Sequence, residues 1–307
     1  MTSPFGVWEP PAADRHLDEE IVRHAIRDDF PEWDIQTVEA IGAGWEREVF
    51  LVDGRVVVHF PRYAAVAEDL GRHARILEFI NGSVGSEVRV PEITLWGDGG
   101  VHFPHAFFGH ELIPGREADP LKPPSSPRLA ADLGKALSAV HAISVDSARD
   151  LGFPVQPWTG EADLEVLRRQ NELVDPPSDM VPAAFEWLTG SPEVPREYAG
   201  PERFVHNDLQ PEHIIVAEAP ERLSGIIDWT AASLGDPSLD FSYLLVLHGK
   251  AFLYRALEAY SLPTDPEFLS RVRFRARVRA LGWLVYALHR KAHLARVLRE
   301  VENAFSA

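Results

Sequence analysis

The sequence predicts an α+β protein with two lobes: a small N-terminal β-sheet lobe over residues 1–112 and a larger, mainly helical C-terminal lobe over residues 113–307. Three observations lead to this prediction. Short apolar runs typical of strands gather in the first third of the chain, around one prominent helical stretch. The pair Pro114-Gly115 then breaks the chain. Beyond this break, apolar residues recur at the spacing of buried helix faces.

The N-terminal lobe is predicted to contain a small sheet whose clearest element is a hairpin. Asp53-Gly54 is a typical sequence for the tight turn between two antiparallel strands. Residues 1–16 are rich in proline and are expected to form an arm on the surface. The predicted elements are a helix over Asp18–Asp28, strands over 35–41, 48–52 and Arg55–Phe60, a helix over Ala64–Ile80, and strands near Ile93–Trp96 and Val101–Leu112.

The C-terminal lobe is predicted to be helical apart from three short strands. Its first helix should begin at Ser126-Pro127, because proline is favoured at the first position of a helix, and should bury a face that includes Leu137 and His141. The further predicted elements are helices over Ala162–Leu173 and Val181–Leu188, strand-like runs at Phe204–Val205, Ile214–Val216 and Leu223–Ile227, and helices from Leu239 onward.

The composition argues against several classes of partner. A formal net charge of −17 disfavours binding to nucleic acid or anionic membranes; the charge either attracts cationic ligands or simply aids solubility. The chain has no cysteine, which rules out disulfides, thiolate metal sites and a cysteine nucleophile and fits the cytoplasm. We see no signal peptide and no stretch that could span a bilayer. We therefore expect a cytoplasmic monomer without nucleic-acid or membrane partners.

Polar residues at the ends of neighbouring strands indicate where the chemistry lies. His206, Asp208 and His213 fall in a loop between two short predicted strands, and Asp228 follows the next strand, fifteen residues after His213. Such residues can converge on one point. Phosphoryl transfer needs this arrangement, because one carboxylate orients the acceptor hydroxyl while other ligands hold a metal ion. The alternative is that these acids only cap turns between strands.

The segments Phe204–Val216 and Gly225–Phe241 resemble the catalytic loop and metal-binding strand of the aminoglycoside phosphotransferase superfamily, whose fold is similar to that of protein kinases. The resemblance implies that Asp208 is the catalytic aspartate and that His213 and Asp228 are the metal ligands. It covers about forty residues in a matching order of strands, and motif and context together make it specific.

The same resemblance implies supporting roles for residues around the catalytic loop. His206 matches the histidine that braces this loop in the family. Asp236 and Asp240 match a Gly-Asp-Pro-x-x-Asp stretch, which is expected to support the loop rather than to take part in the chemistry.

Two details shift the expected acceptor toward macrolides. Most of the superfamily has asparagine at the position of His213, whereas macrolide 2′-phosphotransferases resemble this chain in having histidine there and in the run Ile227-Asp228-Trp229-Thr230. The resemblance thus implies transfer of the γ-phosphate of GTP or ATP to the 2′-hydroxyl of a macrolide, which inactivates the antibiotic. Imidazole suits Mn²⁺ better than Mg²⁺, so we expect Mg²⁺ with some tolerance of Mn²⁺.

The nucleotide is expected to bind the N-terminal lobe. Gly42 and Gly44, in the run from Ile41 to Trp45, lie between two predicted strands, where glycine lets backbone N–H groups approach phosphates closely. An ordinary tight turn is the alternative. Glu111 and Ile113 match the family's hinge, whose backbone would bind the purine. The choice between ATP and GTP stays open.

The expected cation of the nucleotide site is replaced by histidine. The family has Lys or Arg on the third strand, paired with Glu on the following helix, and here these positions are His59 and His73. A neighbour such as Arg62, Arg72 or Glu68 would have to substitute, or the protein is a degenerate kinase. If His59 contacts phosphate, turnover should rise below neutral pH as its imidazole gains a proton.

The acceptor pocket is the least certain part of the prediction. Phe241, Tyr243, Trp283 and Tyr286 can form an apolar wall for a macrolide, although each is individually better explained as helix-packing core. The alternatives to a macrolide kinase are an aminoglycoside kinase or metabolite kinase of the same fold, and a binding protein that has lost catalysis.

Overall fold

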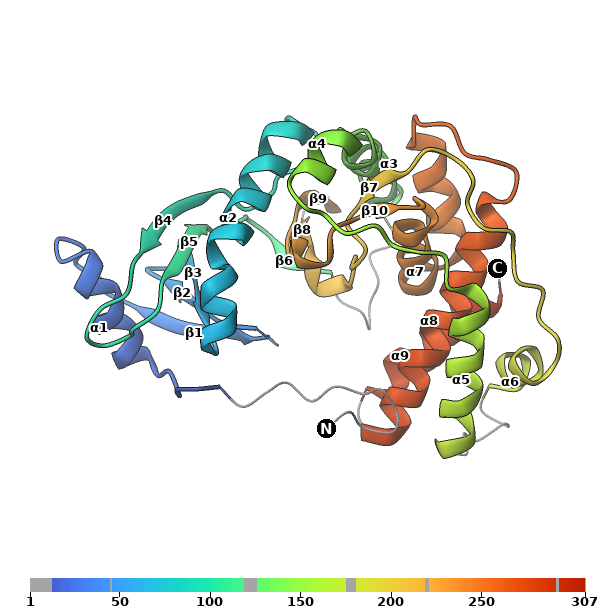
Figure 1. The fold of residues 1–307 in the computed structure, drawn as a ribbon, viewed down its shortest axis with the longest axis horizontal. Helices are drawn as coiled ribbons and strands as arrows, with labels where there is room; N and C mark the ends of the chain where they lie inside the picture. The colour runs from blue at the N-terminus through green and yellow to red at the C-terminus, as the bar shows by residue number, and fades with distance from the viewer. Residues whose placement is uncertain are drawn as a thin grey trace. The chain divides into compact units, whose positions relative to one another are not determined.

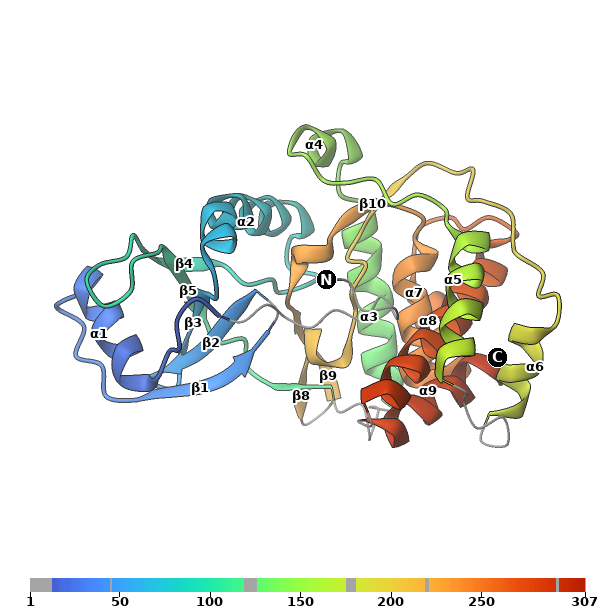
Figure 2. The ribbon, with the colours of Figure 1, turned by 60° about the horizontal axis from the view of Figure 1, so that its bottom comes forward.

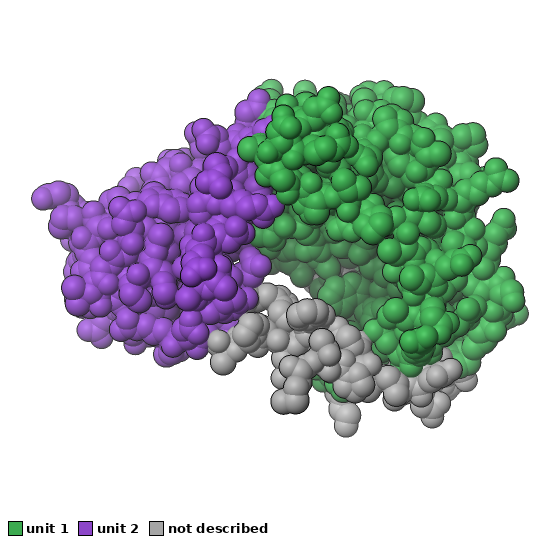
Figure 3. All heavy atoms as spheres, viewed as in Figure 1, with its two compact units in different colours: residues 1–7, 83–88, 115–307 green, residues 8–82, 89–114 purple. Residues whose placement is uncertain are grey.

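The computed structural model describes residues 13–44, 46–118, 126–174, 181–218, 221–290 and 293–306, with the side chains of residues 171–174 and 218 excepted. The described residues group into two compact units (Figure 3). Unit 2 holds the N-terminal part up to residue 82 together with residues 89–114, and unit 1 holds residues 83–88 and the chain from residue 115 onward. The change of unit after Pro114 falls close to the predicted boundary between residues 112 and 113. Most of the predicted N-terminal arm lies outside the described residues.

Unit 2 is built on an antiparallel sheet with the strand order β1-β2-β3-β5-β4 (Figure 1). The hairpin predicted at Asp53-Gly54 is confirmed: both residues are left-handed, with φ of 51° and 64°, as the tight turn requires. The strands are β1 (Val38–Ala43), β2 (Arg47–Val52), β3 (Val56–Pro61), β4 (Ile93–Gly97) and β5 (Phe107–Glu111).

The predicted strand over Val101–Leu112 is wrong in its first half. Val101 is 90% exposed, and the segment before β5 is a loop held to α1 (Glu19–Asp29) by Asp28. Asp28 accepts hydrogen bonds from the N–H and from the ring of His102, each about 2.9 Å long. The contact between Asp28 and His102 could not be inferred from the sequence, because the two residues are 74 positions apart.

The two faces of the sheet carry different side chains, because successive residues of a strand point to opposite faces. Phe50, Phe60 and Phe107 point to the face that α1 covers, and they form a dry aromatic and aliphatic core. On the opposite face Phe108 meets a side chain of α2 (Ala64–Val84): the ring of His73 lies 5.4 Å from the Phe108 ring. His59, of the predicted nucleotide site, lies on this second face, because it stands opposite Phe108 in the β3–β5 ladder.

Unit 1 is mainly helical, as predicted, with strands only beside the catalytic segments. Its described strands form two small antiparallel sheets, β6-β8-β9 and β7-β10. The strands are β6 (Arg116–Glu117), β7 (Arg203–Val205), β8 (Ile214–Glu218), β9 (Glu221–Ile226) and β10 (Ser233–Gly235), and the helices are α3 (Pro127–His141), α4 (Val145–Asp150), α5 (Gly160–Val174), α6 (Pro182–Thr189), α7 (Ser238–Ala259), α8 (Phe268–Arg290) and α9 (Leu294–Phe305).

Helix α7 is the centre of unit 1. It packs against α3, α8 and α9, and it lies beside α3 and α8 in Figure 2. Every residue from Ser238 to Leu247 is buried, so the first turns of α7 are enclosed on all sides. The few polar groups there, among them Asp240 and Tyr243, must therefore find partners inside the protein. Within the described residues, no helix has the length and apolar character needed to cross a membrane.

Candidate active site

The loop around Asp208 is held by the carboxylate of Asp240, at the start of α7. Asp240 Oδ2 accepts a hydrogen bond of 2.9 Å from the N–H of His206, and Oδ1 accepts one of 2.7 Å from the N–H of Asn207. Asn207 has φ of 63°, a left-handed conformation that costs free energy in residues other than glycine. Asp240 thus fixes the strained backbone directly before Asp208.

A buried histidine that the sequence analysis did not assign to the site completes this support. His141 Nε2 lies 3.0 Å from Asp240 Oδ2, and His141 Nδ1 lies 2.8 Å from the hydroxyl of Tyr260. Burial by itself raises the pKa of Asp240, but the hydrogen bond from His141, the nearby imidazoles and the Asn207 N–H lower it overall. The sequence showed His141 only as part of a buried helix face, because its partner is 99 residues away.

His206 connects the catalytic loop to the strand that leads to Asp228. Its Nε2 donates to the carbonyl of Ile227 at 3.0 Å, so Nδ1 is free to accept from the N–H of Asp208 at 3.2 Å. The ring packs against Trp229, with centroids 4.5 Å apart. Burial is the main reason that the pKa of His206 is lowered, although Asp240 opposes the shift. A neutral His206 has the hydrogen-bonding pattern that this position needs.

The structure brings His213 and Asp228 together beside Asp208. His213 Nδ1 lies 2.7 Å from the carbonyl of Asp208 and 3.4 Å from its carboxylate, and His213 Nε2 lies 3.6 Å from Asp228 Oδ2. Asp228 is left-handed, with φ of 57°, and its Oδ1 accepts from the Thr230 hydroxyl at 2.6 Å. This conformation turns Oδ2 toward the imidazole.

The facing atoms of His213 and Asp228 fit a cation. Because His213 Nδ1 donates to the Asp208 carbonyl, a neutral imidazole presents a bare lone pair at Nε2, opposite an anionic carboxylate oxygen. A cation placed between these two acceptors, which lie 3.6 Å apart, would be attracted by both. Among the described residues no group of three or more His, Asp or Glu side chains is arranged around a metal position, so phosphate oxygens and water would complete the coordination, as is usual for Mg²⁺.

Tyr243 holds the carboxylate of Asp208. Its hydroxyl donates to Asp208 Oδ1 at 3.0 Å and lies 3.1 Å from the carbonyl of Asn207. Burial is the main cause of a strongly raised pKa of Tyr243, so this hydroxyl keeps its proton. The guanidinium of Arg279, on α8, stacks 3.6 Å from the centre of the Tyr243 ring. With Oδ1 occupied, Oδ2 is the atom of Asp208 that can receive a proton.

The aromatic wall predicted for the acceptor is partly wrong. Phe241 is 0% exposed and Tyr243 is 4% exposed, so the first is core and the second supports Asp208. Trp283 and Tyr286 are half-buried on α8, with ring centroids 5.6 Å apart, and these two remain candidates for an acceptor surface. The spacing of aromatics in a sequence does not distinguish these cases, since both pairs lie within helices, the first on α7 and the second on α8.

Gly42 lies near the end of β1, where the β1–β2 register shifts, Gly44 lies in the turn that follows, and both are exposed. Neither has a left-handed backbone, and a Cβ atom at Gly42 would meet nothing within 4 Å. At Gly44 it would meet the Arg47 carbonyl at 3.6 Å, an ordinary contact. The fold therefore does not require glycine at either position. Contact with a ligand is an alternative explanation for the two glycines. Trp45 lies outside the described residues.

His59 is joined to the predicted hinge by a chain of hydrogen bonds. His59 Nε2 lies 3.0 Å from His110 Nε2, and His110 Nδ1 lies 2.8 Å from the carbonyl of Glu111. The carbonyl can only accept, so Nδ1 of His110 carries the proton, its Nε2 accepts, and His59 donates. The chain holds together with both imidazoles neutral. Ile113, the other hinge residue, is buried.

The surroundings of His59 disfavour a charged imidazole. Desolvation, followed by the charges of His110, Arg47 and His73, lowers the pKa of His59 well below its usual value. The rings of His59 and His73 both lie against Phe108, at 4.7 Å and 5.4 Å.

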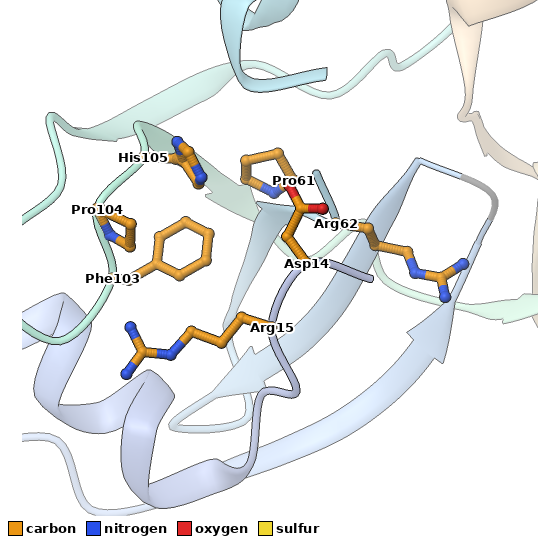
Figure 4. Close-up of a pocket in the computed structure, with 7 residues that line it drawn as sticks. All are labelled: Asp14, Arg15, Pro61, Arg62, Phe103, Pro104 and His105. Atoms are coloured by element: carbon orange, nitrogen blue, oxygen red, sulfur yellow. The ribbon is translucent and has the colours of Figure 1, made fainter. Parts of the chain in front are cut away.

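Arg62, proposed above as a substitute, supports the β1–β2 turn instead. Its Nη1 donates to the carbonyl of Gly44 at 3.0 Å, and its guanidinium extends toward that turn (Figure 4). Arg62 also borders a pocket of about 230 Å³ in unit 2, which contains none of the predicted site residues. This pocket is lined by Asp14, Arg15, Pro61, Arg62, Phe103, Pro104 and His105 (Figure 4).

Comparison with known proteins identifies the family. The model of the phosphotransferase enzyme family matches residues 37–272, a span that includes both predicted site segments. The chain belongs to this family. This membership confirms the family resemblance that was drawn from the segments Phe204–Val216 and Gly225–Phe241. It also confirms the predicted kinase-like α+β fold.

Solved structures agree with this fold. The GDP complex of wild-type aminoglycoside 2′-phosphotransferase-IIIa is 23% identical, with a TM-score of 0.70 over 94% of this chain and 99% of that one. Macrolide 2′-phosphotransferase MphH from Brachybacterium faecium is 21% identical, with a TM-score of 0.58 over 87% and 93%. Among curated proteins, the uncharacterized protein YcbJ of Bacillus subtilis (strain 168) is 27% identical over 110 residues, a match that spans 33% of this chain and 36% of that relative.

Proposed function

We propose that this member of the phosphotransferase enzyme family transfers the γ-phosphoryl group of GTP or ATP to a hydroxyl group of a small molecule. The observation that carries the proposal is the meeting of Asp208, His213 and Asp228 at one place in unit 1, with His213 Nε2 and Asp228 Oδ2 facing each other at 3.6 Å. Family membership and the GDP bound by a structurally similar enzyme support a nucleotide as the donor.

Asp208 acts on the acceptor hydroxyl. Its Oδ2 accepts the hydroxyl proton while the acceptor oxygen forms a bond to the γ-phosphorus. The bond from that phosphorus to the bridging oxygen of the β-phosphate breaks, and the nucleoside diphosphate leaves with the electron pair. Tyr243 keeps Oδ1 of Asp208 in place throughout.

His213 Nε2 and Asp228 Oδ2 are the atoms that would hold the metal ion. Bound there, Mg²⁺, or Mn²⁺ in its place, neutralises charge on the phosphate oxygens. The His213 tautomer is set by its donation to the Asp208 carbonyl. The backbone of Asp208 therefore orients the imidazole that would hold the metal ion.

For the acceptor we propose the 2′-hydroxyl of a macrolide, as part of antibiotic inactivation by a cytoplasmic monomer. His213 and the Ile227–Thr230 run support this choice, as does the similarity in fold to a macrolide 2′-phosphotransferase. A second candidate is a neutral or anionic hydroxylated metabolite. It is favoured by the Arg279 guanidinium, which lies beside the tyrosine that holds Asp208 and would repel a cationic amine next to the reacting hydroxyl.

A mass-spectrometric assay tests the proposal. The protein would be incubated with Mg²⁺, with GTP or ATP, and with macrolides, aminoglycosides and neutral or acidic sugars. We expect an acceptor that gains one phosphoryl group, and a rate about 10²- to 10⁴-fold lower in Asp208→Asn, because the general base is lost. Asp146→Asn, at a 95% exposed side chain, is the control and should retain the full rate.

The outcomes separate the alternatives. A phosphorylated macrolide supports the first candidate, and a phosphorylated sugar supports the second while keeping the mechanism. If no acceptor gains a phosphoryl group with either nucleotide, or if Asp208→Asn is as active as the wild type, the proposed function is wrong.

A further inference from the structure

The backbone of Gln210 connects Asp208 to His213 within the catalytic loop. The N–H of Gln210 donates to the carbonyl of Asp208 at 2.9 Å, and the carbonyl of Gln210 accepts from the N–H of His213 at 3.0 Å. The position of Gln210 therefore influences how Asp208 and His213 stand relative to one another. Gln210 is 9% exposed, so its side-chain amide needs partners inside the protein.

The side chain of Gln210 is held by α9. Arg296 Nη2, on that helix, donates to Gln210 Oε1 at 3.2 Å. A guanidinium can only donate, so the amide must turn its oxygen toward Arg296. Arg296 is 86 residues further along the chain and lies outside the span 37–272 that the family model matches. The family match therefore does not account for this contact.

Arg296 is itself fixed in direction by a buried carboxylate one turn further along α9. Its Nε donates to Glu300 Oε1 at 2.7 Å, and Glu300 is 4% exposed. The N–H groups of a guanidinium lie in one rigid plane, so holding Nε at Glu300 also fixes the direction in which Nη2 points. Arg296 thus presents a preoriented donor to the catalytic loop.

Helix α9 is anchored to the helix that supports the rest of the loop. Asn303 Nδ2, on α9, donates to the carbonyl of Val246, on α7, at 2.9 Å. The same helix α7 carries Asp240 and Tyr243, which hold the backbone before Asp208 and its carboxylate. The catalytic loop is therefore held both before and after Asp208 by helices that pack together. The buried face of α9 consists of Val297, Glu300, Val301 and Ala304.

We propose that Arg296 is a positioning residue of the phosphoryl-transfer site: by holding Gln210 it sets the placement of Asp208 relative to His213. The inference deepens the proposed function and rests on it, since it concerns the same catalytic loop. Such a role matters because a misplacement of about 1 Å can lower a rate roughly 100-fold. An ion pair within α9 alone would explain the contact of Arg296 with Glu300, but not its contact with Gln210.

Hydrogen exchange of the full-length protein, followed by mass spectrometry, tests the contact without any turnover. Gln210→Met keeps the approximate size of the side chain but removes the oxygen that accepts from Arg296. We expect amide exchange in residues 204–216 to become roughly 10-fold faster, because one hydrogen bond to a charged group is lost. Gln156→Ala, at an exposed glutamine, and Arg169→Gln, in an exposed pair with Glu165 on α5, are the controls and should leave this exchange unchanged.

Turnover separates a positioning role from a merely structural one. We expect kcat to fall about 10- to 100-fold in Gln210→Met, measured well below the Tm of the variant. Arg296→Lys keeps a charge beside Glu300 but not the rigid fork of donors, so it should lower kcat by a similar factor. If both residues act through one hydrogen bond, the double variant should be no slower than the slower single variant.

Three results would overturn the inference: unchanged exchange of residues 204–216 in Gln210→Met, a kcat equal to that of the wild type, or losses in kcat that multiply in the double variant. If Gln210→Met does not fold, Arg296→Lys takes its place in the exchange and kcat measurements. The proposed function is judged separately, by product formation in the wild type. Without product, the exchange result still decides whether Arg296 holds the loop through Gln210.

Discussion

The catalytic loop of unit 1 and the α2 face of the unit 2 sheet bring their polar side chains together in different ways. In the loop, Asp208, His213 and Asp228 lie within 21 residues of one another along the chain and meet in space as the motif predicts. On the sheet face, the groups come from three strands and a helix, and the expected cation at His59 is a neutral imidazole. Residues that act together within one segment can be recognised from the sequence, whereas contacts made across strands, such as that of His59 with His110, cannot.

The largest effect should come from breaking the support of the catalytic loop. Asp240→Asn replaces a fully buried carboxylate that accepts two N–H groups and pairs with His141, and an amide can satisfy only part of this set. We expect a loss of about 3–5 kcal/mol in the free energy of unfolding, as for other broken buried pairs, measured by urea denaturation. Asp132→Asn, in a pair with the exposed Arg222, should cost no more than about 1 kcal/mol.

The same carboxylate gives a pH dependence with a defined sign. The folded-state pKa of Asp240 is lowered, so its contribution to stability is complete above the unfolded pKa and is lost as the pH falls through the folded value. The wild type should lose stability on acidification below about pH 4, and the Asp240→Asn protein should lose less over that range. Equal acid sensitivity of both proteins would argue against this ionic support.

The next effect concerns how finely Asp208 is positioned. Tyr243→Phe removes the hydroxyl that holds Asp208 Oδ1 but keeps the ring that stacks on Arg279. We expect kcat to fall roughly 10-fold, about the value of one hydrogen bond to a charged group, with the KM for nucleotide unchanged. Tyr254→Phe, which removes a hydrogen bond to Arg273 elsewhere in unit 1, should change neither constant. A fall in kcat/KM for nucleotide through KM alone would contradict the positioning role.

The contrast between the two regions also explains what the sequence could predict. The lobes, the hairpin at Asp53-Gly54 and the catalytic loop depend on local pattern, and all were visible in the sequence. The hydrogen bonds from His141 and Tyr243 were not, because each joins residues more than 30 positions apart and both looked like core. The pairing of His59 with His110 was hidden for the same reason, since it depends on which strand lies next to β3.

The smallest expected effect tests whether the glycine turn belongs to the fold or to a ligand. Gly42 lies in β1 and Gly54 in the turn between β2 and β3; a Cβ at either would meet nothing within 4 Å, but only Gly54 is left-handed, with φ of 64°. Gly54→Ala should therefore cost about 1–2 kcal/mol of stability, and Gly42→Ala should cost none. If the turn contacts phosphate, Gly42→Ala should nevertheless raise the KM for nucleotide a few-fold, because the added methyl group occupies the approach to the backbone. An unchanged KM together with unchanged stability would mean that the turn does not contact the phosphates of the nucleotide.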